Sequence, residues 1–269
     1  MAINISSLQI ALAQMPANTG GFDFSILTQA GSPSGTMSGM SPKVAIEQAA
    51  KNETKQRKQI AEAPMTKKDI ARYTKVVKNA KTIDDVLNDP IARKVFLKAN
   101  GLGQYQDAVG LAKRALASDP TDASSVAQKL SSIEGGWLDV VLKYNFELFG
   151  IGKLQTTDAL KEITDNYVGE LRLDMLDQQM PGLGTAILFK QIASKLDTPI
   201  KVLGSGIGRE VVTTALGLPQ QLAVQSLQAQ EKALVQRIDV KKFKSEEFVD
   251  RIAQRYLIML NGGTGGVTA

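Results

Sequence analysis

The sequence predicts an all-α fold. Its 269 residues are 43% hydrophobic but only 5% aromatic, with one Trp, so the core must consist mainly of Leu, Ile, Val, Ala and Met. This composition suits helices better than a β-sandwich. No segment sustains the two-residue alternation of strands, whereas apolar residues recur at helical spacing along most of the chain. The length allows one large or two modest domains.

The two ends of the chain differ from the middle. Residues 1–42 are predicted to be a tail and a Gly/Ser/Pro linker, because a weakly amphipathic segment, Asn4–Met15, is followed by PANTGG and QAGSPSGTMSGMSP. One face of that segment carries four apolar residues, which are the candidate partner-binding residues: Ile5, Leu8, Leu12 and Met15. Residues 261–269, NGGTGGVTA, form a second flexible tail. Such ends are either disordered or become ordered on binding.

Between the tails the chain is predicted to form two helical units, residues 43–150 and 151–260. Ser41 followed by Pro42 marks the first helix start, because Pro is favoured in the first turn. From there KVAIEQAAKNETKQRKQIAEA is expected to continue as one polar-rich helix.

Hydroxyl–acid pairs mark two more helix starts. Thr66 with Asp69, and Thr82 with Asp85, have the spacing of a capping box, in which both side chains satisfy backbone N–H groups that lack a partner in the helix. We therefore expect helices to begin at Thr66 and Thr82.

Longer apolar patterns predict the remaining helices. Residues 157–180 form a long amphipathic pattern that ends at Pro181. QLAVQSLQAQEKALVQRI is predicted to be one helix, and SEEFVDRIAQRYLIML another. In the latter, four residues are spaced to share one face: Phe248, Ile252, Tyr256 and Met259. Trp137 is expected to anchor the core.

An internal repeat runs through the chain. Residues 86–104 read VLNDPIARKVFLKANGLGQ, and residues 202–220 read VLGSGIGREVVTTALGLPQ, with nine of 19 positions identical and no gap. Both copies place apolar residues four apart and then a Gly-Leu pair. Each copy therefore predicts one helix and its C-terminal cap.

The cap assigns roles to the repeated glycines and leucines. Gly101 and Gly217 are predicted to end the helices in the left-handed conformation, and Leu102 and Leu218 to fold back, buried, onto the last turn. The only repeated charges are Arg93 and Arg209, for which we expect an ion pair or a contact to a helix carbonyl.

GSGIGRE, residues 204–210, resembles a phosphate-binding loop only superficially. Its G-x-G-x-G spacing matches neither established glycine fingerprint, and no predicted strand precedes it. Copy one has NDPIARK at the same place, where Asn or Asp caps the helix and Pro90 occupies its first turn. Because both versions open a helix by different chemistry, a phosphate site is not expected.

The chain contains no Cys and no His. Disulfides, Cys/His zinc sites, Ser-His-Asp triads, Cys nucleophiles and His bases are therefore excluded. Acid–base chemistry would rest on carboxylates, Lys or Tyr. We predict no cofactor, no metal site and no small-molecule substrate.

The net charge is +5, with 32 Lys and Arg among 27 Asp and Glu. The densest cluster is KQRK, Lys55–Lys58, followed by Lys67 and Lys68. Because the charges are scattered, we interpret this cluster as a solvated helix face and do not expect nucleic acid as a partner. No apolar stretch is long enough to span a membrane, and the N-terminus lacks a basic region before its apolar residues, so no secretory signal is predicted.

Residues 68–130, followed by DVVLKYNFELFG, resemble an uncharacterised bacterial family, the domain of unknown function numbered 1217. The residues that fit its pattern are Asp85, Val86, Leu87, Ala99, Gly101, Leu102, Ser118, Asp119, Ala127, Leu130 and Phe146. The second half is similar to a closing unit of the family, so the resemblance covers about residues 68–260. The family has no established enzymatic role, and its genes often lie among flagellar genes.

The resemblance implies a non-enzymatic structural or interaction protein of the bacterial flagellum, in the basal body, in the rod or hook, or linked to export. Its termini would dock on other flagellar proteins or on further copies. The alternative is a helical binder of an anionic ligand or nucleic acid that uses Lys55–Lys68 and Arg209. A third hypothesis, an enzyme that uses carboxylates or the Gly204–Gly208 loop, is disfavoured by the lack of His and Cys.

Overall fold

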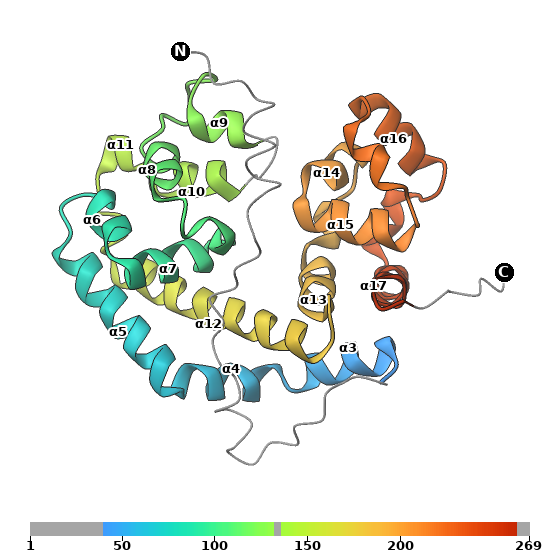
Figure 1. Cartoon of the computed structure of the whole chain (residues 1–269), viewed down its shortest axis with the longest axis horizontal. Coiled ribbons are helices and arrows are strands. Elements are labelled where there is room, and N and C mark those ends of the chain that lie inside the picture. Colours follow the sequence, from blue (N-terminus) through green and yellow to red (C-terminus); the bar gives the residue numbers. More distant parts are fainter. Residues whose placement is uncertain (1–39, 132–135, 263–269) are drawn as a thin grey trace. The chain divides into compact units, whose positions relative to one another are not determined.

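The computed structural model describes residues 40–131 and 136–262, and within these ranges all regular structure is helical, with no strand (Figure 1). The predicted all-α fold class is confirmed. The candidate partner-binding residues Ile5, Leu8, Leu12 and Met15, with most of the predicted linker and C-terminal tail, lie outside the described residues.

The helices of the first half are short and follow one another closely. They are α3 (Pro42–Lys51), α4 (Glu53–Glu62), α5 (Pro64–Asn79), α6 (Ile83–Asn88), α7 (Pro90–Ala99), the 3-10 turn η1 (Gly103–Tyr105), α8 (Val109–Leu116), α9 (Val126–Ser131), α10 (Gly136–Tyr144) and α11 (Phe146–Phe149).

The second half begins with the longest described helix. It contains α12 (Thr157–Gln179), α13 (Leu183–Ile192), η2 (Ala193–Lys195), α14 (Pro199–Gly204), α15 (Gly206–Ala215), η3 (Gln220–Val224), α16 (Leu227–Val235), η4 (Val240–Lys244) and α17 (Glu246–Leu260).

Two predicted helix starts are confirmed and one is wrong. The Ser41 hydroxyl accepts a hydrogen bond from an N–H of the first turn of α3, and Thr82 with Asp85 forms the expected capping box of α6. Helix α5, however, begins at Pro64, so Thr66 lies inside it and is buried. Asp69 does not cap a helix, because its carboxylate binds Lys94 and the Tyr167 hydroxyl.

Two segments predicted as single helices are interrupted. The polar helix after Ser41 divides into α3 and α4 at Asn52. There the buried Arg172 of α12 donates hydrogen bonds to the Ala49 carbonyl and to Gln56 Oε1. A cation at the end of α3 complements the helix dipole, so α12 stabilises the break. The segment predicted as one helix from Gln221 likewise divides into η3 and α16.

Helix α12 joins the two halves of the fold. Its main neighbours are α7, α13 and α4, and Figure 1 shows it passing from α7 to α13. Near its start Ile163 and Tyr167 are buried, and near its end Leu176 belongs to a core that also contains α3, α13, α15 and α17 residues. The predicted long amphipathic helix is therefore confirmed, and it contributes to the packing of both halves.

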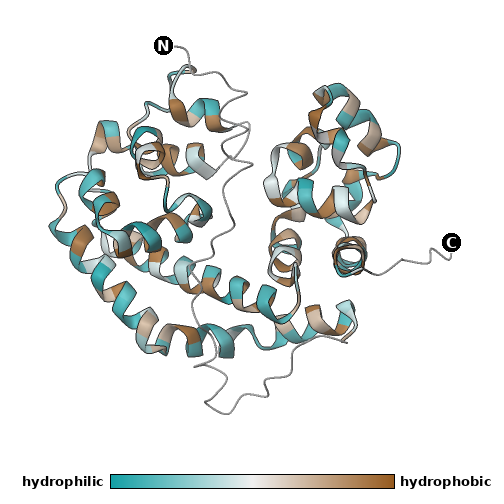
Figure 2. Cartoon of the chain, viewed as in Figure 1, coloured by the Kyte–Doolittle hydropathy of each residue, from teal (hydrophilic) through white to brown (hydrophobic). Residues whose placement is uncertain are grey.

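The core is built as the composition predicts, mainly from aliphatic side chains with few aromatic rings. Figure 2 shows hydrophobic and hydrophilic positions alternating along the helices, as expected of helices that bury one face. Trp137 is fully buried beside Tyr105, and Phe96 contacts Tyr144. On α17 the predicted apolar face is correct for Ile252 and Tyr256 but wrong for Met259, which is exposed at the end of the helix.

The two repeat copies have the same helical structure. Helices α6 and α7 have the same boundaries as α14 and α15 after a shift of 116 residues. Gly101 has a φ of 71° and Gly217 a φ of 60°, so both glycines occupy the left-handed region, as predicted. The Leu102 N–H donates to the Leu97 carbonyl, and the Leu218 N–H to the Thr213 carbonyl, which is the same Schellman pattern.

The prediction for the two cap leucines is half right. Leu102 is fully buried, whereas Leu218 is only partly buried. The backbone of the cap is thus common to both copies, but its hydrophobic contact is complete only in the first.

Candidate functional site

The glycine-rich stretch at the start of α15 is a helix cap. The Ser205 hydroxyl accepts a hydrogen bond from the Gly208 N–H at 3.0 Å, so this donor is not available to an anion. Gly208 is buried, and a Cβ atom there would come within 2.7 Å of Leu196 Cδ1. The glycine therefore serves close packing, in agreement with the prediction that no phosphate site is present.

The repeated arginines bind helix carbonyls. Arg93 Nη1 donates to the Leu87 carbonyl and Arg209 Nε to the Leu203 carbonyl, both at 2.6 Å. Each guanidinium thus satisfies the C-terminal end of the preceding short helix, α6 or α14. This confirms the expected structural contact, and it weakens the alternative in which Arg209 binds an external anion.

One hollow in the described structure has a volume of about 460 Å³. Residues from α12, α4, the end of α7, α10 and α13 line it, among them Arg57, Asn100, Lys143, Gly169 and Glu170. Arg57 donates to the Asp165 carbonyl at 2.8 Å and lies so close to Gly169 that a Cβ there would be 2.8 Å from Nη1. A side chain at this position would therefore displace the guanidinium.

Three acids lie on one side of α12 near this hollow: Glu170, Asp174 and Asp177. Burial raises the pKa of Glu170 to about 7, with Asp174 and Asp177 adding to the effect and Lys98 opposing it. Burial also raises the pKa of Asp177 to about 6, although the hydrogen bond from the Gly184 N–H opposes it. Asp174 is held by Lys98 at 2.5 Å.

A carboxyl group with a pKa near 7 could exchange protons at neutral pH, as a general acid or base must. The described residues that line the hollow include no Ser, Thr, Tyr, Cys or His, and Lys143 is bound to Glu162. The carboxylates of Glu53, Asp139 and Glu170 line the hollow together with basic side chains, so it combines groups of both charges.

Sequence reasoning did not identify Glu170. Its signal was the spacing of acids at positions 170, 174 and 177, which places like charges on one helix face next to the apolar residues Tyr167 and Leu171. Only the packing of α12 against its neighbours removes Glu170 from water and shifts its pKa.

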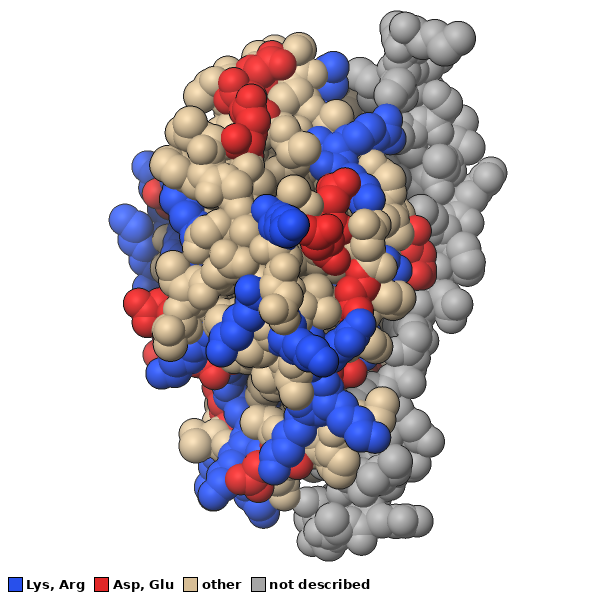
Figure 3. Space-filling view, turned by 90° about the vertical axis from the view of Figure 1, so that its left-hand side faces the viewer, with Lys and Arg blue, Asp and Glu red and all other residues tan. Residues whose placement is uncertain are grey.

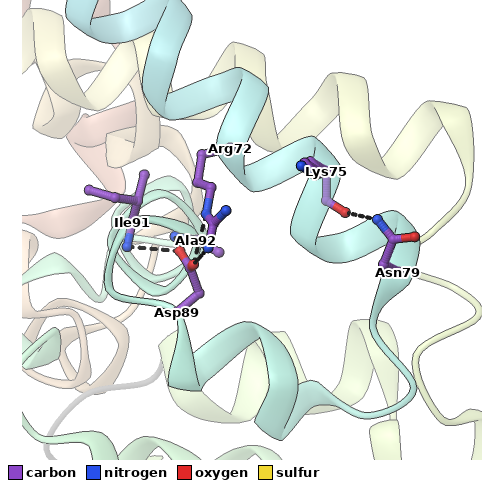
Figure 4. A network of polar contacts seen from close by, with 6 residues as sticks. All are labelled: Arg72, Lys75, Asn79, Asp89, Ile91 and Ala92. Carbon is purple, nitrogen blue, oxygen red and sulfur yellow. Dashed lines mark hydrogen bonds and ion pairs between the residues drawn. The ribbon is translucent and has the colours of Figure 1, made fainter.

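A second hollow lies between α5 and the α6–α7 corner, where polar side chains are already paired (Figure 4). Asp89 Oδ2 accepts from Arg72 Nη2 at 2.6 Å and Nε at 2.8 Å, and Oδ1 accepts from the Ile91 and Ala92 N–H groups. On α5, Asn79 Nδ2 donates to the Lys75 carbonyl at 2.7 Å. The Arg72–Asp89 contacts hold α5 against the start of α7.

Large apolar side chains are exposed at the α10–α11 corner. Leu142 of α10 is 58% exposed, and on α11 Leu148 is 70% and Phe149 51% exposed. Asn145, in the left-handed conformation, caps α11 by accepting from the Leu148 N–H at 3.1 Å. This cap directs Phe146 into the core, where it stacks on Tyr144, while Leu148 and Phe149 face solvent.

The Phe149 ring is covered on one side by Lys153, whose Nζ lies 3.7 Å from the ring centroid. Large patches of exposed apolar side chains mark surfaces that contact other proteins. We call Leu142, Leu148 and Phe149 the α11 apolar surface.

Two other site classes find no support in the part of the chain described. Within residues 40–131 and 136–262, no three acidic side chains are placed to hold a metal ion. None of the helices in these ranges combines the length and apolar character needed to cross a bilayer.

Comparisons with known proteins identify the family. The family described as "Protein of unknown function (DUF1217)" matches residues 99–249, more than half of the chain, so the chain belongs to this family. None of the curated proteins matches the sequence. The fold is similar to the crystal structure of protein AGR_C_984 from Agrobacterium tumefaciens, with a TM-score of 0.67 and 19% identity, over 82% of this chain and 93% of that one. At this identity the likeness concerns the fold alone.

Proposed function

We propose that this protein is a non-enzymatic structural or interaction protein associated with the bacterial flagellum, and that it acts by binding other flagellar proteins or further copies of itself. The flagellar assignment rests on the gene context of the family that the sequence resembles. The non-enzymatic assignment is supported by the lack of His and Cys and by the lining of the hollow beside Glu170, which includes no Ser, Thr or Tyr.

The observation that carries the interaction role is the α11 apolar surface. Three large side chains, each more than half exposed, come from one corner of the fold: Leu142, Leu148 and Phe149. Covering them with a partner would gain about 25 cal/mol for each Å² of apolar surface removed from water. In this proposal the corner binds protein partners together with the N-terminal face of Ile5, Leu8, Leu12 and Met15.

The location is tested in a strain that lacks the gene. We expect reduced swimming on soft agar, restored by a tagged copy, and recovery of the tagged protein with purified basal bodies. A strain that swims normally, with the tagged protein absent from basal bodies, would overturn the flagellar assignment.

The interaction surfaces are tested by matched variants in the complemented strain. Leu148→Asp on α11 should reduce recovery with basal bodies, whereas Val224→Asp, at a position that is 88% exposed, should not. Deletion of residues 2–30 should abolish recovery and leave the melting temperature of the helical body nearly unchanged. If the truncated protein still assembles, the interface lies on the helical body. If its helical body unfolds, the deleted segment belongs to the core.

A further inference from the structure

The basic charge of the chain is concentrated in one segment. Residues 51–81 contain ten of the 32 Lys and Arg but three of the 27 Asp and Glu, a net charge of +7. The remaining residues have 22 basic and 24 acidic side chains, a net charge of −2. The overall excess of +5 therefore originates entirely in the end of α3, in α4 and α5, and in the turn after α5.

All eight lysines of this segment are exposed, and seven of them lie on α3, α4 and α5, where their ammonium groups have no ion pair or hydrogen bond with any described residue. The seven are Lys51, Lys55, Lys58, Lys67, Lys68, Lys75 and Lys78, and we call them the lysine face. Elsewhere several lysines are paired with carboxylates, including Lys94 with Asp69 and Lys190 with Asp250, both at 2.6 Å. Of the three acids of the segment, Asp69 is buried, Glu53 contacts Arg172, and only Glu62 is exposed.

Packing turns these lysines to one side of the fold. Helix α4 buries Ile60 and packs against α12, and α5 buries Tyr73 and Val77 against α7, so the lysine positions point away from both contacts. In Figure 3, Lys and Arg side chains gather on the lower part of the visible face, at the height where Figure 1 places α4 and the lower end of α5.

The fold itself does not need this face. Like charges three or four residues apart destabilise a helix by a few tenths of a kcal/mol each, and Lys55 with Lys58 in α4 and Lys75 with Lys78 in α5 are such pairs. Seven unpaired lysines thus oppose folding slightly and stabilise no described contact. A partner that supplies negative charge would remove this repulsion.

The chemistry of the face indicates which polyanion fits. Both arginines of the segment are already bound, Arg57 to the Asp165 carbonyl and Arg72 to Asp89, so no guanidinium fork remains for phosphates or base edges. Its aromatic residue, Tyr73, is fully buried, so no ring is available to stack on a base. Both features are unfavourable for nucleic acid recognition.

A membrane surface fits less well than a protein. Helices that lie on bilayers insert several large apolar side chains beside their basic residues. In residues 51–81 one large apolar side chain is exposed, Met65 at 50%, and the apolar faces of α4 and α5 are turned into the core. The lysines have flexible side chains, are spread over α3, α4 and α5 and line no common pocket, so they match a partner whose carboxylates can adapt to them.

We propose that the lysine face binds an acidic polypeptide segment of a protein partner. This inference goes beyond the proposed function, because it concerns a different surface and holds wherever the protein resides. Exposed Lys–carboxylate pairs contribute only about 0.2–1 kcal/mol each, so several must act together, and the binding is steered by long-range attraction.

The test uses the full chain and a fluorescein-labelled peptide of about twenty glutamates, followed by fluorescence anisotropy. The face variant is Lys55→Glu/Lys58→Glu/Lys68→Glu. The matched control is Lys232→Glu/Lys241→Glu/Lys242→Glu, which makes the same charge change at exposed positions of α16 and η4. Circular dichroism melts identify any variant that does not fold. If the face variant does not fold, a variant with Gln in place of the same three lysines is used instead.

We expect wild type to bind the peptide, the face variant to lose about tenfold or more in affinity, and the control to lose less than about threefold. Binding should weaken between 50 and 200 mM salt. Equal losses in the two variants would overturn the proposal, because they would show a response to net charge alone. Tighter binding of a 20-base-pair duplex, or of vesicles with 30% phosphatidylserine, would overturn it in favour of those partners.

Discussion

The two repeat copies, α6–α7 and α14–α15, have the same backbone but different surroundings. Their helices begin and end at equivalent residues, and both end at a left-handed glycine. In copy one the N-cap of α7 is Asp89, whose carboxylate also accepts hydrogen bonds from two nitrogens of Arg72. In copy two the N-cap of α15 is Ser205, whose hydroxyl accepts a hydrogen bond from the Gly208 N–H. The residue 116 positions after Arg72 is Leu188, so copy two has no equivalent cation.

The leucines of the two caps also differ, because the one in copy one is more deeply buried. Leu102 is fully buried, and Leu218 is partly exposed. The nine shared residues therefore encode the helix, its end and the arginine–carbonyl contact. The neighbouring helices decide how much each copy contributes to stability. Copy one is the more deeply integrated, and each of the following substitutions measures one part of that difference.

The largest difference is expected from the cap leucines. Leu102→Ala should lower the free energy of unfolding by about 2–5 kcal/mol, because it leaves a cavity in a closed core. Leu218→Ala should cost about 1 kcal/mol or less, because solvent already reaches this side chain. Urea unfolding followed by circular dichroism measures both. Equal losses would mean that the two caps are packed alike.

The cap glycines should show no difference between the copies. Gly101→Val and Gly217→Val should each cost about 2 kcal/mol, because a β-branched residue resists a positive φ. A Cβ at Gly101 would have no neighbour within 4 Å, and one at Gly217 would meet only Met259 Cε at 3.7 Å, so the cost comes from the backbone. Thermal melts that match wild type for either variant would contradict the shared cap.

The smallest difference is expected at the helix starts. Ser205→Ala should cost about 1 kcal/mol through the lost cap, and Asp89→Ala somewhat more, since it also releases Arg72. Partial burial raises the pKa of Asp89, but hydrogen bonds from the Ala92 N–H and Arg72 outweigh this and hold the pKa below its usual range. A lowered pKa gives stability above the unfolded pKa that is lost as pH falls.

The effect of Asp89→Ala should therefore be full at pH 7 and shrink below about pH 4, while that of Ser205→Ala stays nearly constant. Unfolding curves at pH 7, 5 and 3 test this. A pH-independent loss at Asp89 would show that the Arg72 contact and the cap contribute nothing through charge.

The sequence by itself determined the features that depend on a few neighbouring residues. The all-α class follows from apolar spacing, the ends of α7 and α15 follow from Gly101 and Gly217, and the start of α6 follows from the Thr82–Asp85 spacing. These features are local because caps and left-handed residues satisfy backbone groups within one helical turn. The same local reasoning identified the basic cluster at Lys55–Lys68 but interpreted it only as a solvated face.

Only the tertiary structure decided the features that depend on residues far apart in the chain. It placed Arg172 against the end of α3, which divides the predicted first helix, and it turned Asp69 from a cap into the partner of Lys94 and Tyr167. It also partly buried Glu170 and left Leu148 and Phe149 exposed. It bound both arginines of α4 and α5 to groups within the fold, so that only lysines remain free there. The physical reason is that desolvation and pairing are set by which helices meet, and no spacing within one helix records its neighbours.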